Sequence, residues 1–177
     1  SWGFAGSYSF YATKTMPIGE GGMVVSYDND FLKWIERYRN YGKQVIDGKV
    51  NYPVKNGFNY RMNEFSAALG IVQLEQLPEI LKWKNELASK YDRIFQNRVI
   101  FPDNMVSGYY KYIVYDCELK EETGKVFART DLGHVIDGLD ISLPNAEWIS
   151  THHKCVPIYH GWDKAVLNAD DLKACLF

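Results

Sequence analysis

The residues whose types could do chemistry are a lysine near a strand end and the polar and glycine residues around it. Lys14 follows a short aromatic segment, Ser9 lies five residues before it, and a Gly-Glu-Gly-Gly run occupies positions 19–22. A lysine that forms a Schiff base must present a neutral amine at a fixed point, and a strand end fixes its stem. The Ser9 hydroxyl can bind a phosphate group, and the glycines allow a sharp turn and close backbone approach. The order of these residues predicts a covalent cofactor site.

Taken singly, each of these features is weak. A lysine in a loop is usually a solvated charge, and a Gly-Glu-Gly-Gly run alone is also typical of a hairpin turn. A nucleotide-binding P-loop is excluded, because its lysine follows the glycines and precedes Ser or Thr, whereas Lys14 precedes the main glycine cluster. The interpretation therefore depends on the combination of Lys14 with other segments.

The elements that must position Lys14 are two strands and a helix. Short β-rich segments flank a loop with three glycines and a proline, and the two strands are expected to pair across it. Apolar residues then recur at helical spacing from Phe31 to Tyr38. The expected boundaries are strands at 7–11 and 23–27, a helix from Asp28 or Asn29 to about Tyr41, and a long surface loop at 42–58.

The rest of the chain reads as a helical middle and an α+β tail. Asn63 is expected to cap a helix to about Gln76, and Pro78 fits the first turn of another helix ending near Asn97. Residues 138–160 are expected to be irregular apart from one strand. The remaining expected elements are a strand at 109–117, a short helix from Thr130 or Asp131 to Ile136, a strand near 155–159, and a helix from Asn168 or Asp170.

Composition and charge exclude several classes of protein. Of 177 residues, 46% are hydrophobic and 24% charged, and the formal net charge is −2 without a basic stripe, so a nucleic-acid partner is not expected. No apolar run approaches the ~20 residues of a membrane-spanning helix. Three widely spaced cysteines form no CxxC pair, which favours free thiols in a cytoplasmic protein and indicates no metal site. The chain lacks an initiator Met and a signal peptide, so we expect a piece of a longer protein.

Four segments together resemble a known family. SFYATK with GEGGM, at positions 9–14 and 19–23, is similar to the cofactor-lysine segment of the DegT/DnrJ/EryC1/StrS sugar aminotransferases. GFNYRM at 57–62 looks like their Gly-x-Asn-x-Arg-Met motif. The run AALG with QL, at 67–70 and 73–74, matches the helix that follows, and YYKYIV at 109–114 resembles the strand that opens their small domain. The resemblance is strongest over residues 6–92 and faint after about residue 120.

The resemblance implies a pyridoxal 5′-phosphate cofactor and a role for each matching residue. Lys14 would hold the cofactor as a Schiff base, and Ser9 would hydrogen-bond its phosphate. Asn59 would reach the phosphate of the neighbouring subunit's cofactor, because the family's active sites lie at a dimer interface. Arg61 would help the same interface, anchor its own loop or bind substrate, and His160 would line the sugar pocket.

The implied reaction is a ping-pong transamination. Glutamate is the expected amino donor, and a nucleotide-linked keto sugar is the expected acceptor, in cell-surface polysaccharide or natural-product sugar biosynthesis. The amine of Lys14 would move a proton as general base and then acid, while the cofactor ring stores the electron pair. The implied partners are these small molecules and a second copy of the chain, without a membrane.

The implied fold class is α/β, a fragment of an aspartate-aminotransferase-like (fold type I) transferase. It would comprise the edge of the large-domain sheet and a smaller α+β C-terminal domain. The expected divisions are 1–76 for the end of the large cofactor-binding domain, 77–108 for a connecting helix and linker, and 109–177 for an incomplete small domain.

Two alternatives remain open. Some family members use the cofactor for sugar dehydration, but they carry histidine in place of the lysine, so Lys14 argues against this reaction. The second alternative is a non-catalytic dimerisation or scaffold fragment, in which the glycine run is only a hairpin.

Overall fold

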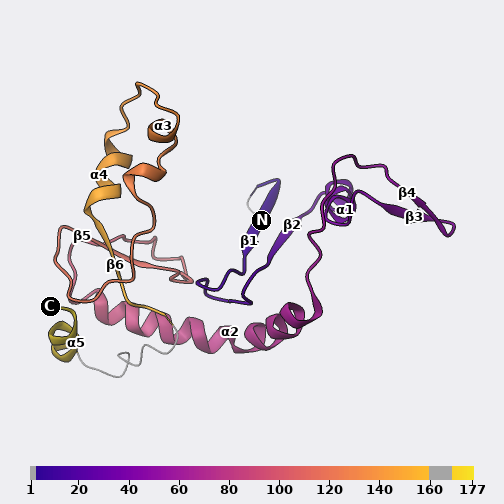
Figure 1. The fold of residues 1–177 in the computed structure, drawn as a ribbon. Coiled ribbons are helices and arrows are strands. Elements are labelled where there is room, and N and C mark those ends of the chain that lie inside the picture. Colours follow the sequence, from indigo (N-terminus) through magenta and orange to yellow (C-terminus); the bar gives the residue numbers. More distant parts are fainter. Residues whose placement is uncertain (1–2, 160–168) are drawn as a thin grey trace. The chain divides into compact units, whose positions relative to one another are not determined.

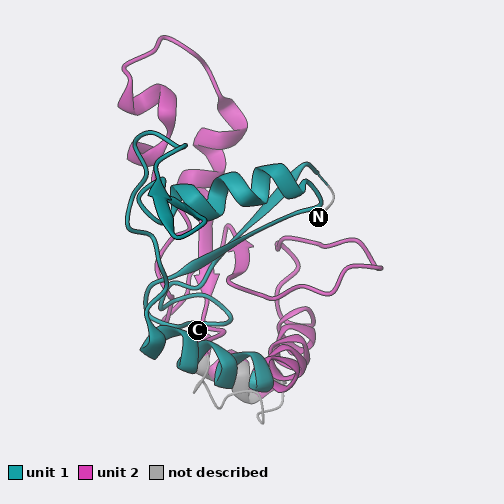
Figure 2. Cartoon of the chain, turned by 90° about the vertical axis from the view of Figure 1, so that its right-hand side faces the viewer, with its two compact units in different colours: residues 1–76 teal, residues 77–177 magenta. Residues whose placement is uncertain are grey.

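The computed structural model describes residues 3–159 and 169–177. The chain divides into two compact units, Ser1–Gln76 and Leu77–Phe177 (Figure 2). The helix α2, Glu64–Tyr91, begins in the first unit and ends in the second (Figure 1). In the described ranges, no helix combines the length and the apolar character needed to cross a membrane.

The first unit begins with the expected hairpin. Strands β1, Ala5–Ser9, and β2, Gly22–Ser26, pair antiparallel with Ser9 opposite Gly22. The predicted pairing across the lysine loop is thus confirmed. The strand β1 ends two residues earlier than predicted, because the chain turns after Ser9 and Phe10 closes the loop by donating its N–H to Gly21 O at 2.9 Å.

The helix α1, Asn29–Tyr38, follows directly. The carboxylate of Asp28 accepts hydrogen bonds from the N–H groups of Asp30 and Phe31 at 3.0 and 2.9 Å, which confirms the predicted cap. The helix stops before the predicted Tyr41, because Tyr41 and Gly42 both take positive φ angles, 59° and 75°, that no right-handed helix contains.

The prediction of an unstructured surface loop over 42–58 is partly wrong. It contains a short hairpin of β3, Gln44–Ile46, and β4, Lys49–Asn51. The two connecting residues, Asp47 and Gly48, have φ angles of 49° and 74°. Asp-Gly between two short segments that contain β-branched residues is a strong hairpin signal, and it predicts the local structure better than the Gly- and Asn-rich composition around it.

The predicted break at Pro78 is also wrong, because α2 is one continuous helix from Glu64 to Tyr91. Its start is as predicted, since Asn63 Oδ1 accepts from the N–H of Ser66 at 2.9 Å. A proline inside a helix costs about 3 kcal/mol. Buried packing of the C-terminal half of α2, with Leu87 fully buried, offsets this cost.

The second unit has a closed core. Strands β5, Tyr112–Tyr115, and β6, His153–Val156, pair antiparallel beside the end of α2. The strand β5 is shorter than the predicted 109–117, because Tyr109 and Asp116 have positive φ angles of 40° and 50°. The core comprises Leu87, Ala88, Tyr91, Phe95, Tyr112, Val114, Val156, Ile158 and Leu176.

The rest of the second unit differs in detail from the expectation. The predicted short helix is a 3₁₀ turn η1, Arg129–Asp131, followed by α3, Gly133–Ile136. The expected irregular stretch contains α4, Pro144–His152, whose signal is a proline in the first turn. The strand β6 begins earlier than predicted and ends before Pro157, which has no N–H to donate. The final helix α5 is Ala169–Leu176, and the predicted cap Asn168 lies outside the described residues.

Candidate functional site

Lys14 lies in the loop that joins β1 to β2 (Figure 1). Its N–H donates to Tyr11 O at 2.9 Å, which closes a turn directly after the strand. Ser9, the last residue of β1, accepts the N–H of Tyr11 on its Oγ at 3.4 Å. The hydroxyl proton of Ser9 is therefore left to donate. Lys14 is half-buried, so its side chain leaves a packed part of the loop rather than a fully solvated loop tip.

The lysine loop is held in place by Ile18. This side chain is only 4% exposed, and its N–H donates to Phe10 O at 2.9 Å. A Cβ placed on Gly70 of α2 would lie 3.5 Å from the Ile18 methyl, and one on Gly21 would lie 3.5 Å from the Met62 methyl. The loop is thus packed between the start of α2 and the segment before it. The glycine run and these later residues therefore lie together in the first unit.

Asn59 and Arg61 sit on a segment that pairs with the end of α1. Tyr41 N–H donates to Phe58 O, and Tyr60 N–H donates to Arg39 O, both at 2.9 Å. Between these bonds Asn59 bridges Asn40 in antiparallel register. The two predicted residues therefore project from a backbone fixed on both sides.

A glycine contact sets this pairing. A Cβ on Gly57 would collide with the backbone of Tyr41 and Gly42, and a Cβ on Gly42 would collide with the carbonyl group of Val54. Only glycine allows the two segments to cross this closely. The glycine of the GFNYRM motif is thus a packing requirement of the Asn59 segment.

The side chains of Asn59 and Arg61 touch each other. Arg61 Nε donates to Asn59 Oδ1 at 3.0 Å, and the Arg61 guanidinium lies 5.3 Å from the centre of the Tyr41 ring. Residues two apart on an extended segment lie on one face, which brings the pair together. The contact with Tyr41 was not predicted, because nothing in the sequence pattern marks a left-handed tyrosine.

A cleft of about 940 Å³ opens between the β1–β2 hairpin, α1 and the segment before α2. Of the predicted residues it contains Arg61, together with Gly21 and Gly22, whereas Ser9, Lys14 and Asn59 are not among its lining residues. Glu36 and Arg39 also line it. Their signal in the sequence is helical spacing with Leu32 and Ile35 along one face of α1.

The donor set fits a phosphate-bearing aldehyde cofactor. Lys14 supplies a primary amine from the turn that follows β1, and Ser9 keeps a hydroxyl proton to donate. The Asn59 amide oxygen is taken by Arg61, so its NH₂ group is the end that can meet an anion. Among residues 3–159 and 169–177, no group of three His, Cys, Asp or Glu side chains is placed to hold a metal ion.

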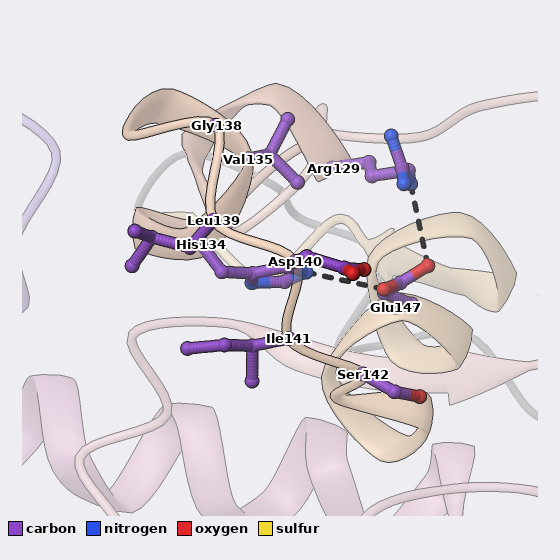
Figure 3. Close-up of a pocket in the computed structure, with 9 residues that line it drawn as sticks. All are labelled: Arg129, His134, Val135, Gly138, Leu139, Asp140, Ile141, Ser142 and Glu147. Atoms are coloured by element: carbon purple, nitrogen blue, oxygen red, sulfur yellow. Dashed lines mark hydrogen bonds and ion pairs between the residues drawn. The ribbon is translucent and has the colours of Figure 1, made fainter.

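A second cavity, of about 400 Å³, lies in the other unit and holds none of the predicted residues. Figure 3 shows Glu147 of α4 between His134 of α3 and Arg129 of η1. His134 Nε2 lies 3.1 Å from Glu147 Oε1, and Arg129 Nε lies 3.4 Å from Glu147 Oε2. The hydrogen bond from His134 and the charge of Arg129 lower the pKa of the Glu147 carboxyl. These contacts tie the three short helices together.

The predicted His160 lies outside the described residues. The neighbouring His153 is buried and structural, because its Nε2 accepts the N–H of Val126 at 2.9 Å. Its burial removes it from consideration as a substrate contact.

The sequence is similar to that of sugar aminotransferases. A model of the DegT/DnrJ/EryC1/StrS aminotransferase family matches residues 1–129. The chain is 35% identical over 100 residues to the UDP-4-amino-4,6-dideoxy-N-acetyl-beta-L-altrosamine transaminase of Helicobacter pylori, covering 55% of this chain and 26% of that protein. It is 29% identical over 177 residues to the GDP-perosamine synthase of Caulobacter vibrioides, covering 98% of this chain and 44% of that protein.

Solved structures share the fold. The aminotransferase PseC of Helicobacter pylori, involved in the biosynthesis of pseudoaminic acid, superposes with a TM-score of 0.74 at 22% identity, covering 97% of this chain and 51% of that one. The expected fold class is confirmed: this α/β chain has the fold type I architecture of such transferases and spans about half of their length.

Proposed function

Since the chain belongs to the DegT/DnrJ/EryC1/StrS aminotransferase family, we propose that its protein is a pyridoxal-phosphate-dependent aminotransferase that aminates a nucleotide-linked keto sugar. The observation that carries the proposal is the half-buried Lys14, at the end of the turn that follows β1, inside the family-matched segment. A relative named as a transaminase of a UDP-linked amino sugar and relatives named as GDP-perosamine synthases support the substrate class. Lys14, rather than histidine, argues against dehydration, and the aminotransferase family match over residues 1–129 argues against a scaffold role.

Each residue of the site has a proposed task. Lys14 Nζ binds the cofactor aldehyde covalently and, once released, accepts a proton and returns it. Ser9 donates its hydroxyl proton to the phosphate, because its lone pair already receives the N–H of Tyr11. Asn59 donates its amide hydrogens to the phosphate. When bound, the cofactor supplies the electron sink that transamination requires.

The proposed domain division is 1–76 for part of the large domain, 77–108 for a connector and 109–177 for part of the small domain. The boundary between the compact units, at Gln76 and Leu77, supports the first division. A cytoplasmic location is proposed as well, since Cys117 and Cys155 are free thiols, which suit a reducing compartment.

The test of the cofactor uses the whole protein. Pyridoxal phosphate should give a visible absorption band, and borohydride should fix the cofactor on the peptide that contains Lys14. Lys14→Ala should abolish both signals, while Lys33→Ala, an exposed lysine of α1 that pairs with Asp30, should keep them. A folded wild-type protein without the band would exclude the proposal. Glutamate with a panel of nucleotide keto sugars, followed by 2-oxoglutarate formation, then identifies the acceptor.

We also propose a homodimer with shared sites, which a heterodimer can test. One subunit carries Lys14→Ala and its partner carries Asn59→Ala. If Asn59 acts across the interface, both defects fall in one site and the other site binds the cofactor with wild-type affinity. If it acts within its own subunit, every lysine-bearing site is weakened, and the shared-site proposal is wrong.

A further inference from the structure

We propose that Arg61 is a positioning residue: carried on the ring of Tyr41, it turns the Asn59 amide so that N–H donors alone face a phosphate. The inference rests on the proposed function, and it deepens that function by assigning the residue that sets the orientation of the anion-binding amide. Three observations carry it: a fixed backbone, a donor-only partner and a strained tyrosine.

The backbone under Asn59 is fixed. Hydrogen bonds from Tyr41 N–H to Phe58 O and from Tyr60 N–H to Arg39 O, both 2.9 Å, flank the Asn59 position. The close crossing at Gly57 locks the same segment. The remaining freedom of Asn59 is the rotation of its side chain, and above all of its terminal amide.

Arg61 removes that freedom. A guanidinium has five N–H donors and no acceptor, so the Asn59 atom that meets Arg61 Nε at 3.0 Å must be the oxygen. The amide NH₂ group then faces away from Arg61 with two hydrogens to donate. Without this partner an exposed amide can turn either end outward, and the oxygen would repel a phosphate.

Tyr41 holds the guanidinium in turn. The Arg61 Cζ atom lies 5.3 Å from the centre of the ring, within the range of a cation–π contact. Tyr41 has a φ of 59°, a left-handed conformation that is uncommon and strained for a bulky residue. A strained residue that persists at a ligand-binding segment is typical of a functional constraint. Here the strain puts the ring under Arg61.

The resulting element is a row of donors without an acceptor. It comprises the two amide hydrogens of Asn59, with the positive charge of Arg61, which Arg61→Lys would keep, beside them. Such a row suits a phosphate monoester, which offers several acceptor oxygens and two negative charges. Preorganising the amide raises phosphate affinity because the bound orientation is already set.

A double-variant cycle in the whole protein tests the role of Arg61. The measurement is the dissociation constant of pyridoxal phosphate from the apoprotein, together with the ³¹P resonance of the bound cofactor. Arg61→Lys keeps the charge but loses Nε, so affinity should fall about fivefold, as for one hydrogen bond. Asn59→Ala should weaken binding by about tenfold, and adding Arg61→Lys to Asn59→Ala should change nothing further.

Two more variants complete the design. Tyr41→Asn should weaken binding as Arg61→Lys does and leave the unfolding midpoint unchanged or higher, because asparagine tolerates a positive φ better than tyrosine. Arg37→Lys on α1 makes the same exchange away from Asn59 and should leave both the dissociation constant and the ³¹P resonance at their wild-type values.

The outcomes separate the inference from the function. Wild-type affinity in Arg61→Lys, or an equal loss in the presence and absence of Asn59, would overturn the positioning role while cofactor binding at Lys14 stands. A loss of affinity in each single variant, with a double variant that binds no more weakly than Asn59→Ala alone and with the ³¹P resonance displaced alike, supports it. Absence of cofactor binding in the wild type defeats both proposals together.

Discussion

The two halves of α2 carry similar apolar residues in opposite environments. In the second unit, Leu87 and Tyr91 are fully buried in the core, whereas in the first unit Phe65 is 90% exposed and Leu74 is 60% exposed. Among residues 3–76, the buried apolar side chains are Ile18 and Val54. The unit with the proposed chemistry is therefore held by backbone ladders and glycine contacts, and the other unit is held by its own core.

The sharpest test of this comparison is truncation of the same residue type in both halves. Leu87→Ala should lower the free energy of unfolding by about 2–5 kcal/mol, because it opens a cavity in a closed core. Leu69→Ala, at a site that is 44% exposed, should cost under about 1 kcal/mol in this chain. Denaturant unfolding with amide exchange in each unit measures both. Equal losses would mean that the first unit also has a core.

A pair of glycine variants tests the first unit. Gly57→Ala should destabilise it by about 1–3 kcal/mol, because the new Cβ meets the backbone of Tyr41 and Gly42. Gly70→Ala should stabilise α2 by about 0.5–1 kcal/mol, since its Cβ meets only the Ile18 methyl at 3.5 Å and alanine favours a helix. Thermal unfolding compares them. If Gly57→Ala is neutral, glycine contacts do not hold this unit.

The smallest effect concerns a buried charge beside the core of the second unit. Lys84 is 5% exposed and donates to Tyr109 O at 2.9 Å. Burial, with repulsion from Lys111, lowers the pKa of Lys84 to about 8. The unfolded chain, with a lysine pKa near 10.5, then binds more protons than the folded chain above pH 8, so stability rises with pH in this window.

Because of Lys84, the free energy of unfolding should rise by about 1–2 kcal/mol between pH 8 and 9.5. Lys84→Met should remove this slope, whereas Lys82→Met, at an exposed site of the same helix, should keep it. Measurements should stop below pH 10, because burial and the hydrogen bond to Asp92 raise the pKa of Tyr112, which makes stability fall where free tyrosine ionises. A flat wild-type profile would contradict the prediction.

Local signals in the sequence were enough for several elements. Asp28 and Asn63 cap their helices as predicted, and the strands on either side of the lysine loop pair. Capping and short-range pairing depend on residues a few positions apart, so their pattern is visible in the sequence. Asp47-Gly48 was an equally clear hairpin signal, but the predicted surface loop was based on the Gly- and Asn-rich composition of the segment instead. The proposed roles of Ser9, Lys14, Asn59 and Arg61 are still predictions, and the resemblance that suggested them is supported by the family match.

The sequence by itself determined the family, the place of Lys14 between two pairing strands and the order of the elements around it, because these follow from residue types at short spacing. Only the tertiary structure decided that α2 runs through Pro78, since the packing that offsets the proline comes from residues far along the chain. It also decided that the Arg61 guanidinium lies over the Tyr41 ring and donates to the Asn59 side chain. Such contacts depend on the direction in which a side chain leaves a residue with a left-handed backbone, and residue spacing in the sequence does not predict that direction.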